Sequence, residues 1–195
     1  MSPAAGNPGR VGEGSPIHRK IRTKHHPRAA GIVGRPKGFA SDDMTTSLRE
    51  NVLEASRRDD VADFVERLYA DLQLEIDARK PLCVISGRCC KFEEYGHRLY
   101  VTTLELATFV KRRADAPIPE ASDPGSCPFQ SNKLCGVHAI RPFGCRMFFC
   151  DATATDWQQA AYERYHAKLK QLHEELGVPY AYVEWRAGLD QLRTE

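Results

Sequence analysis

All seven cysteines of this 195-residue chain lie within one segment, between residues 83 and 150. They are Cys83, Cys89, Cys90, Cys127, Cys135, Cys145 and Cys150. The number is odd, and residues 1–16 contain no apolar segment typical of a secretory signal, so a disulfide framework is not expected. Thiolates gathered at short spacings in a reducing compartment are typical metal ligands. The cluster therefore predicts a metal site that holds either zinc or an iron–sulfur centre.

The segments that carry these cysteines contain little regular structure. Proline and glycine interrupt the chain from Pro117 to Gly125, and at most one helical turn is expected around residues 137–140. Such a segment would need bound metal to hold it in place. Cys89 and Cys90 are adjacent, and neighbouring side chains of an extended segment point to opposite sides. This favours either two metal centres or one polynuclear cluster.

Four motifs accompany the cysteines in the middle third of the chain. They are the Cys89-Cys90 pair, the segment Tyr100-Val101-Thr102 with Glu105, Cys127-Pro128-Phe129, and Arg141-Pro142-Phe143-Gly144-Cys145-Arg146. In this combination the sequence resembles the bacterial cysteine-cluster family known by its CxxCxxCC pattern. That family is described as zinc- or iron-chelating and includes the flagellin lysine N-methylases.

The resemblance implies a ligand role for every cysteine of this chain. The implied metal ligands are Cys83, Cys89, Cys90, Cys127, Cys135, Cys145 and Cys150. Ser86 departs from the family pattern, because it stands where the second thiol is expected. Loss of that thiol would leave one site short of a ligand, or would recruit His138 or His97. Zinc and iron are not distinguished by these ligand types.

Two further functions stay open beside metal binding. The resemblance implies metal-dependent modification of a protein side chain, with a protein as substrate, whereas the sequence lacks nucleotide-binding patterns such as G-x-G-x-x-G. A zinc-stabilised nucleic-acid module is the other alternative. Arg141 and Arg146 flank Cys145, where they could contact thiolates or an anionic substrate, although ion pairing with acidic residues is the favoured interpretation.

Apolar periodicity predicts a mostly α fold. Val61, Val65, Leu68 and Leu72 recur at helical spacing, which indicates a helix from about residue 60, capped by Asp59 or Asp60 and ended before Pro81. Further helices are expected over residues 45–56, 103–113 and 156–176, with Thr155 as N-cap and Gly177 as stop, and within 180–192. We expect a small helical domain around an irregular metal-bound loop layer, with at most one or two short strands.

Charge divides the chain into two predicted regions. Residues 1–40 carry eight basic residues and one acidic residue and are rich in Gly and Pro, so we expect a disordered basic arm. Residues 41–195 are the predicted cysteine-cluster domain, with residues 83–150 as its core. Nucleic acid is a candidate partner of the arm alone. No apolar run approaches the roughly 18 residues of a membrane helix, and a cytoplasmic location is expected.

Overall fold

The computed structural model describes residues 47–114 and 116–193. The expected basic arm, and with it the suggested nucleic-acid contact, lies outside this range. None of the described helices combines the length and the apolar composition needed to cross a bilayer.

The described residues form a mostly helical domain, which confirms the predicted fold class. The helices are α1 (Leu48–Ser56), α2 (Asp59–Arg79), α3 (Thr103–Arg113), α4 (Phe143–Arg146), α5 (Thr155–Leu176) and α6 (Trp185–Arg193). The strands are β1 (Tyr100–Thr102), β2 (Gln130–Ser131), β3 (Leu134–Cys135) and β4 (Tyr182–Glu184). Within these residues there are four short strands where one or two were expected, paired antiparallel as β1 with β4 and β2 with β3.

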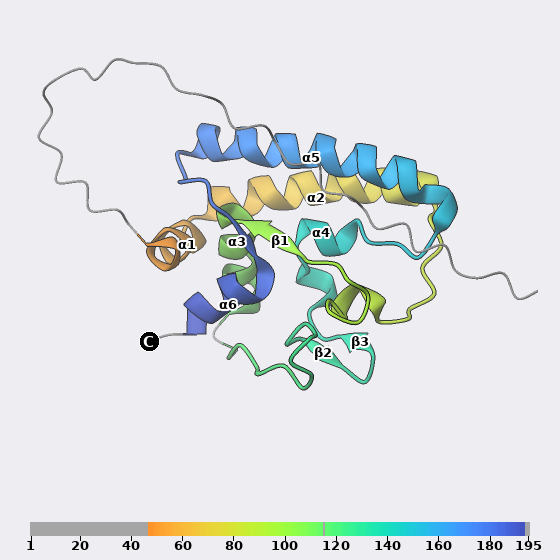
Figure 1. The fold of residues 1–195 in the computed structure, drawn as a ribbon. Helices are drawn as coiled ribbons and strands as arrows, with labels where there is room; N and C mark the ends of the chain where they lie inside the picture. The colour runs from red at the N-terminus through yellow and green to blue at the C-terminus, as the bar shows by residue number, and fades with distance from the viewer. Residues whose placement is uncertain (1–46, 115, 194–195) are drawn as a thin grey trace, which may run out of the picture. The chain divides into compact units, whose positions relative to one another are not determined.

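Helices α2 and α5 run side by side in opposite directions, and the β2–β3 ribbon lies on the other side of the domain (Figure 1). Each long helix buries one apolar stripe, so that Leu72 of α2 and Leu169 of α5 are fully buried. Glu75 of α2 accepts a hydrogen bond from the hydroxyl of Tyr165 at 2.8 Å and pairs with Arg164. The two helices form the frame on which the shorter elements rest.

Helix α3 begins at the capping box that the sequence predicts. The backbone amide of Thr102 donates to Oε2 of Glu105 at 2.8 Å, and the hydroxyl of Thr102 accepts from the amide of Glu105. Glu105 is nevertheless 2 % exposed, and its other oxygen accepts from the amide of Phe143 at 3.0 Å. This carboxyl group therefore joins the start of α3 to α4, which carries Cys145.

Two predicted N-caps are wrong, because in each case the helix begins earlier than expected and includes the predicted cap residue. Asp59 and Asp60 lie inside α2, whose N-cap is Arg58, and Asp59 pairs instead with Lys111 at 2.7 Å. Thr155 lies inside α5, because the 3-10 turn of residues 152–154 leads directly into that helix. Gly177, by contrast, ends α5 in a left-handed conformation as predicted.

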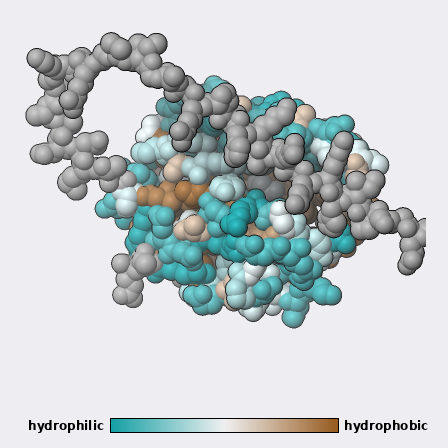
Figure 2. Space-filling view, viewed as in Figure 1, coloured by the Kyte–Doolittle hydropathy of each residue, from teal (hydrophilic) through white to brown (hydrophobic). Residues whose placement is uncertain are grey.

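An aromatic cluster links α6 and α3 to the cysteine-rich segment. The ring of Trp185 packs edge-on against Phe109, with centroids 4.9 Å apart, and Phe129 lies 5.3 Å from Phe109. Phe129 belongs to the predicted Cys127-Pro128-Phe129 motif. The surface seen in Figure 2 is largely hydrophilic, with hydrophobic residues gathered in one small patch. Phe109, Phe129 and Trp185 are all buried, so their packing fixes the position of residues 127–129.

Candidate metal centre

Backbone hydrogen bonds bring two separate cysteine-bearing segments together. The amide of Cys127 donates to the carbonyl of Cys90 at 2.7 Å, and the amide of Glu93 donates to the carbonyl of Gly125 at 3.1 Å. The side chain of Gln130 donates to the carbonyl of Gly87 at 2.9 Å. Residues 87–93 and 125–130 thus lie against each other, although about 35 residues of chain separate them.

Four thiols meet around Cys90. The thiol of Cys90 interacts with those of Cys89, Cys127 and Cys135. Cys90 and Cys127 are 4 % and 5 % exposed, and Cys89 and Cys135 are half-buried. Because the adjacent residues 89 and 90 lie in a 3-10 turn rather than an extended segment, both of their thiols reach this group. The expectation that they point to opposite sides is therefore wrong.

Hydrogen bonds within the group lower the pKa of three thiols and raise that of Cys90, whose single S–H can be donated to one neighbour at a time. The thiol of Cys90 lowers the pKa of Cys127 and Cys135 most strongly, and the backbone amides of Phe129 and Val137 lower them further. The pKa of Cys89 is also lowered, again chiefly by the thiol of Cys90. Each amide comes from the second residue after its cysteine. Both turns therefore present a backbone donor to a thiolate, the form of cysteine that binds metal.

The remaining three cysteines differ in burial and in their contacts. Cys145 is half-buried, and burial, followed by the charges of Cys127, Cys135 and Cys89, raises its pKa. Cys83 is exposed, whereas Cys150 is half-buried with its Sγ atom 3.5 Å from the hydroxyl of Ser86. Ser86, which stands where the resemblance implied another thiol, thus faces Cys150. Cys83 and Cys150 are outside the group around Cys90.

The four thiols are neighbours and not a formed coordination shell. Among residues 47–114 and 116–193, no three or more His, Cys, Asp or Glu side chains are arranged so that they could hold a metal ion. Coordination would therefore require the thiols around Cys90 to turn toward a common point. The chemistry of the donor set fits zinc or iron, because it consists of soft thiolates with backbone donors beside them.

The two candidate histidines have other contacts. Nε2 of His97 lies 3.4 Å from the carbonyl oxygen of Cys89, and its ring packs between Phe92 and Phe148. Nε2 of His138 contacts the guanidinium group of Arg141. Burial lowers the pKa of both rings, which favours their neutral form. His97 lies against the backbone of the thiol group, whereas His138 is turned toward Arg141.

Sequence reasoning did not find Trp185, whose side chain interacts with the thiol of Cys127 and helps to lower its pKa. The indole N–H is a donor only, so it favours the thiolate. Trp185 is 58 residues from Cys127 along the chain, and no local pattern connects the two. The contact arises only because α6 folds back onto α3.

Gly87 is a second residue that the sequence did not single out. Its φ is +72°, and a Cβ atom there would lie 2.7 Å from the carbonyl oxygen of Lys133 and 2.8 Å from Nε2 of Gln130. We expect Gly87→Ala to separate the turn of residues 88–90 from the β2–β3 ribbon, lowering both the melting temperature and the metal affinity. Gly96→Ala is the matched control, because Gly96 has φ +63° but no atom within 4 Å of the added Cβ. Equal effects of the two substitutions would show that backbone strain alone matters here.

Comparison of the chain with protein-family models, with curated protein sequences and with solved structures gave no match.

Proposed function

We propose that this protein binds a metal centre, zinc or an iron–sulfur cluster, at the thiol group around Cys90. The donors are Cys89, Cys90, Cys127 and Cys135, with Cys145 beside them. The observation that carries the proposal is the meeting of these thiols from segments distant in sequence, two of them with a backbone amide that favours the thiolate. When bound, the metal would cross-link loops that have little secondary structure of their own.

Ordinary packing explains this arrangement less well. A buried cysteine behaves as a small apolar residue when it packs among carbon atoms, and its pKa then rises. At Cys127 and Cys135, hydrogen bonds lower the pKa in spite of burial. Cys90 keeps its proton within this group, because its contacts with Cys127, Cys135 and Cys89 raise its pKa. A bound metal ion would take the place of that proton.

The outer cysteines fit a second donor position. Leu82 donates its amide to Oδ2 of Asp151 at 3.1 Å, which places Cys83 on a segment tied to the residue after Cys150. We propose Cys83 and Cys150 as donors there, with the hydroxyl of Ser86 beside Cys150. Metal-dependent modification of a protein side chain stays a prediction from the family resemblance, and no contact among the described residues specifically favours it.

Anaerobic purification followed by elemental analysis and an absorption spectrum of the same sample tests the proposal. We expect zinc or iron in a fixed ratio to protein. Iron with acid-labile sulfide and visible absorption would identify a cluster, and colourless protein with zinc would identify a zinc site. Folded, metal-free protein whose seven thiols all react with a thiol reagent, and which takes up neither metal on reconstitution, would overturn it.

A further inference from the structure

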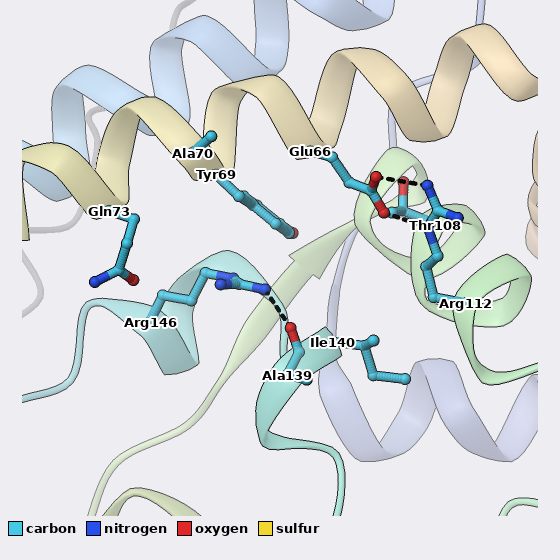
Figure 3. A pocket seen from close by; sticks show the side chains of 9 residues that line it. All are labelled: Glu66, Tyr69, Ala70, Gln73, Thr108, Arg112, Ala139, Ile140 and Arg146. Carbon is cyan, nitrogen blue, oxygen red and sulfur yellow. Dashed lines mark hydrogen bonds and ion pairs between the residues drawn. The ribbon is translucent and has the colours of Figure 1, made fainter.

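A cavity of about 270 Å³ lies between α2, α3, α4 and the 3-10 turn His138–Ile140. Its lining residues are Glu66, Tyr69, Ala70, Gln73, Thr108, Arg112, Ala139, Ile140 and Arg146. Figure 3 shows Arg146 and Tyr69 extending into it from opposite walls, with the Glu66–Arg112 pair at one end. None of the seven cysteines lines it. The cavity is therefore separate from the proposed metal centre.

Arg146 is the cationic residue of this cavity that has no ion pair among the described residues, although Glu66 acts on its charge from farther away. Its Nε and Nη2 atoms donate to the carbonyl oxygens of Arg141 and Ala139, both at 2.9 Å, and the guanidinium group lies 4.4 Å above the ring of Tyr69. In the described part of the chain, Nη1 has no hydrogen-bond partner and no carboxylate lies within ion-pair distance. Ion pairing with acidic residues, which the sequence favoured for Arg146, is not observed.

This environment holds a half-buried cation in place and leaves one of its nitrogens, Nη1, free to donate. Two carbonyl groups orient the guanidinium plane but do not neutralise it, and the Tyr69 ring covers one face. A guanidinium group fixed in this way is suited to a carboxylate or phosphate oxygen. Because its orientation is already set by the protein, an incoming anion would not have to order the side chain.

The other walls restrict the size and the charge of the ligand. Arg112 is paired with Glu66, so the second cation of the cavity is already neutralised and a carboxylate lies beside it. A dianion such as phosphate would meet one free cation and the negative charge of Glu66. Tyr69, Ala70 and Ile140 offer carbon surface for a short hydrocarbon chain. The volume lies just below the range of about 300–1,000 Å³ of pockets for drug-sized ligands.

We propose that this cavity is a binding site for a small organic monocarboxylate, whose carboxylate group binds Nη1 of Arg146 and whose carbon chain packs on Tyr69 and Ile140. The site goes beyond the proposed metal function and does not depend on it.

Titration of the purified protein with butyrate, followed by two-dimensional amide NMR at constant ionic strength, tests this assignment. We expect saturable shifts of the amide signals of Thr108, Ile140 and Arg146, and no saturable shifts there with chloride or inorganic phosphate. Arg146→Gln should weaken butyrate binding at least tenfold. Arg79→Gln is the matched control, because Arg79 also donates to a backbone carbonyl, that of Thr153, but does not line the cavity.

A second variant keeps the test decisive if Arg146→Gln does not fold. Ala70 is exposed at the rim, so Ala70→Trp should fill the entrance and abolish binding while leaving Arg146 in place. Three results would overturn the proposal: no saturable shift in the wild type, unchanged affinity in the folded Arg146→Gln or Ala70→Trp variant, or equal binding of butyrate and phosphate. Wild-type protein that binds butyrate but no metal would contradict only the metal proposal.

Discussion

Replacing Cys90 by serine is expected to remove the metal held by the group around Cys90 and to destabilise the segment of residues 83–150. The thiol of Cys90 is hydrogen-bonded to those of Cys127, Cys135 and Cys89, so its loss removes the centre of the group. Serine has nearly the same size but is a poor ligand for zinc or iron. Structural zinc sites in small domains contribute about 10–16 kcal/mol of apparent binding free energy near pH 7. A loss of metal should therefore lower the melting temperature strongly.

Metal content and thermal unfolding of the same samples measure this effect. Cys83→Ser is the control, since Cys83 is exposed and lies outside the group around Cys90, so the metal of that group should be retained. If Cys90→Ser keeps the wild-type metal ratio and melting temperature, Cys90 is a buried core residue and the proposed centre is wrong. Loss of all bound metal in each of the two variants would instead indicate one centre shared by all seven cysteines.

The elements that sequence alone predicted well depend on local interactions. The Thr102–Glu105 capping box joins residues three positions apart, and the stop at Gly177 depends on the conformation of one residue. The apolar spacing of α2 likewise repeats within one segment. The predicted Thr155 cap failed because Asp151 starts a helical turn earlier, accepting the amide of Thr153 at 2.9 Å, while the Thr155 hydroxyl turns back to Ala152.

Which cysteines lie together in the candidate site could not be predicted from their spacing, because long-range contacts bring them together. The sequence indicated which residues carry the chemistry but not which of them are neighbours. That Cys89 and Cys90 face the same group follows from the 3-10 turn after Gly87, and the approach of Cys127 follows from its backbone bond to Cys90. The contact of Trp185 with Cys127 and the free guanidinium nitrogen of Arg146 both result from tertiary packing. Sequence patterns predict helices better than they predict such long-range contacts.

Stability is expected to fall as the pH rises from about 4.5 to about 7, through the titration of Glu105. Burial raises the pKa of this carboxyl group to about 7, in spite of hydrogen bonds from Thr102, Phe143 and Tyr69 that lower it. The folded protein therefore keeps the proton up to about pH 7, whereas the unfolded chain releases it near 4.5. Between these values the unfolded chain binds fewer protons, so the free energy of unfolding decreases with rising pH. At about 1.4 kcal/mol per pH unit, the total is on the order of 3 kcal/mol.

Glu105→Gln isolates this contribution from other titrating groups. Glutamine has nearly the same shape but does not titrate, so the variant should lose most of the slope between pH 5 and 7. Its free energy of unfolding should also be lower. The side-chain NH₂ group of glutamine would face one of the two backbone N–H groups that now donate to Glu105, and two donors cannot bond to each other. Chemical unfolding of both proteins at several pH values between 4 and 8 measures the difference.

Glu50 offers a matched control within the same chain. It occupies the same capping-box position in α1, where its side chain accepts from the amide of Ser47 at 2.8 Å, but it is exposed and its pKa is lowered by these hydrogen bonds. Glu50→Gln should therefore leave the slope between pH 5 and 7 unchanged. An equal loss of slope in both variants would assign the effect to helix capping. A slope that persists in Glu105→Gln would show that the buried carboxyl group is already ionised in the folded protein, with its three donors outweighing its burial.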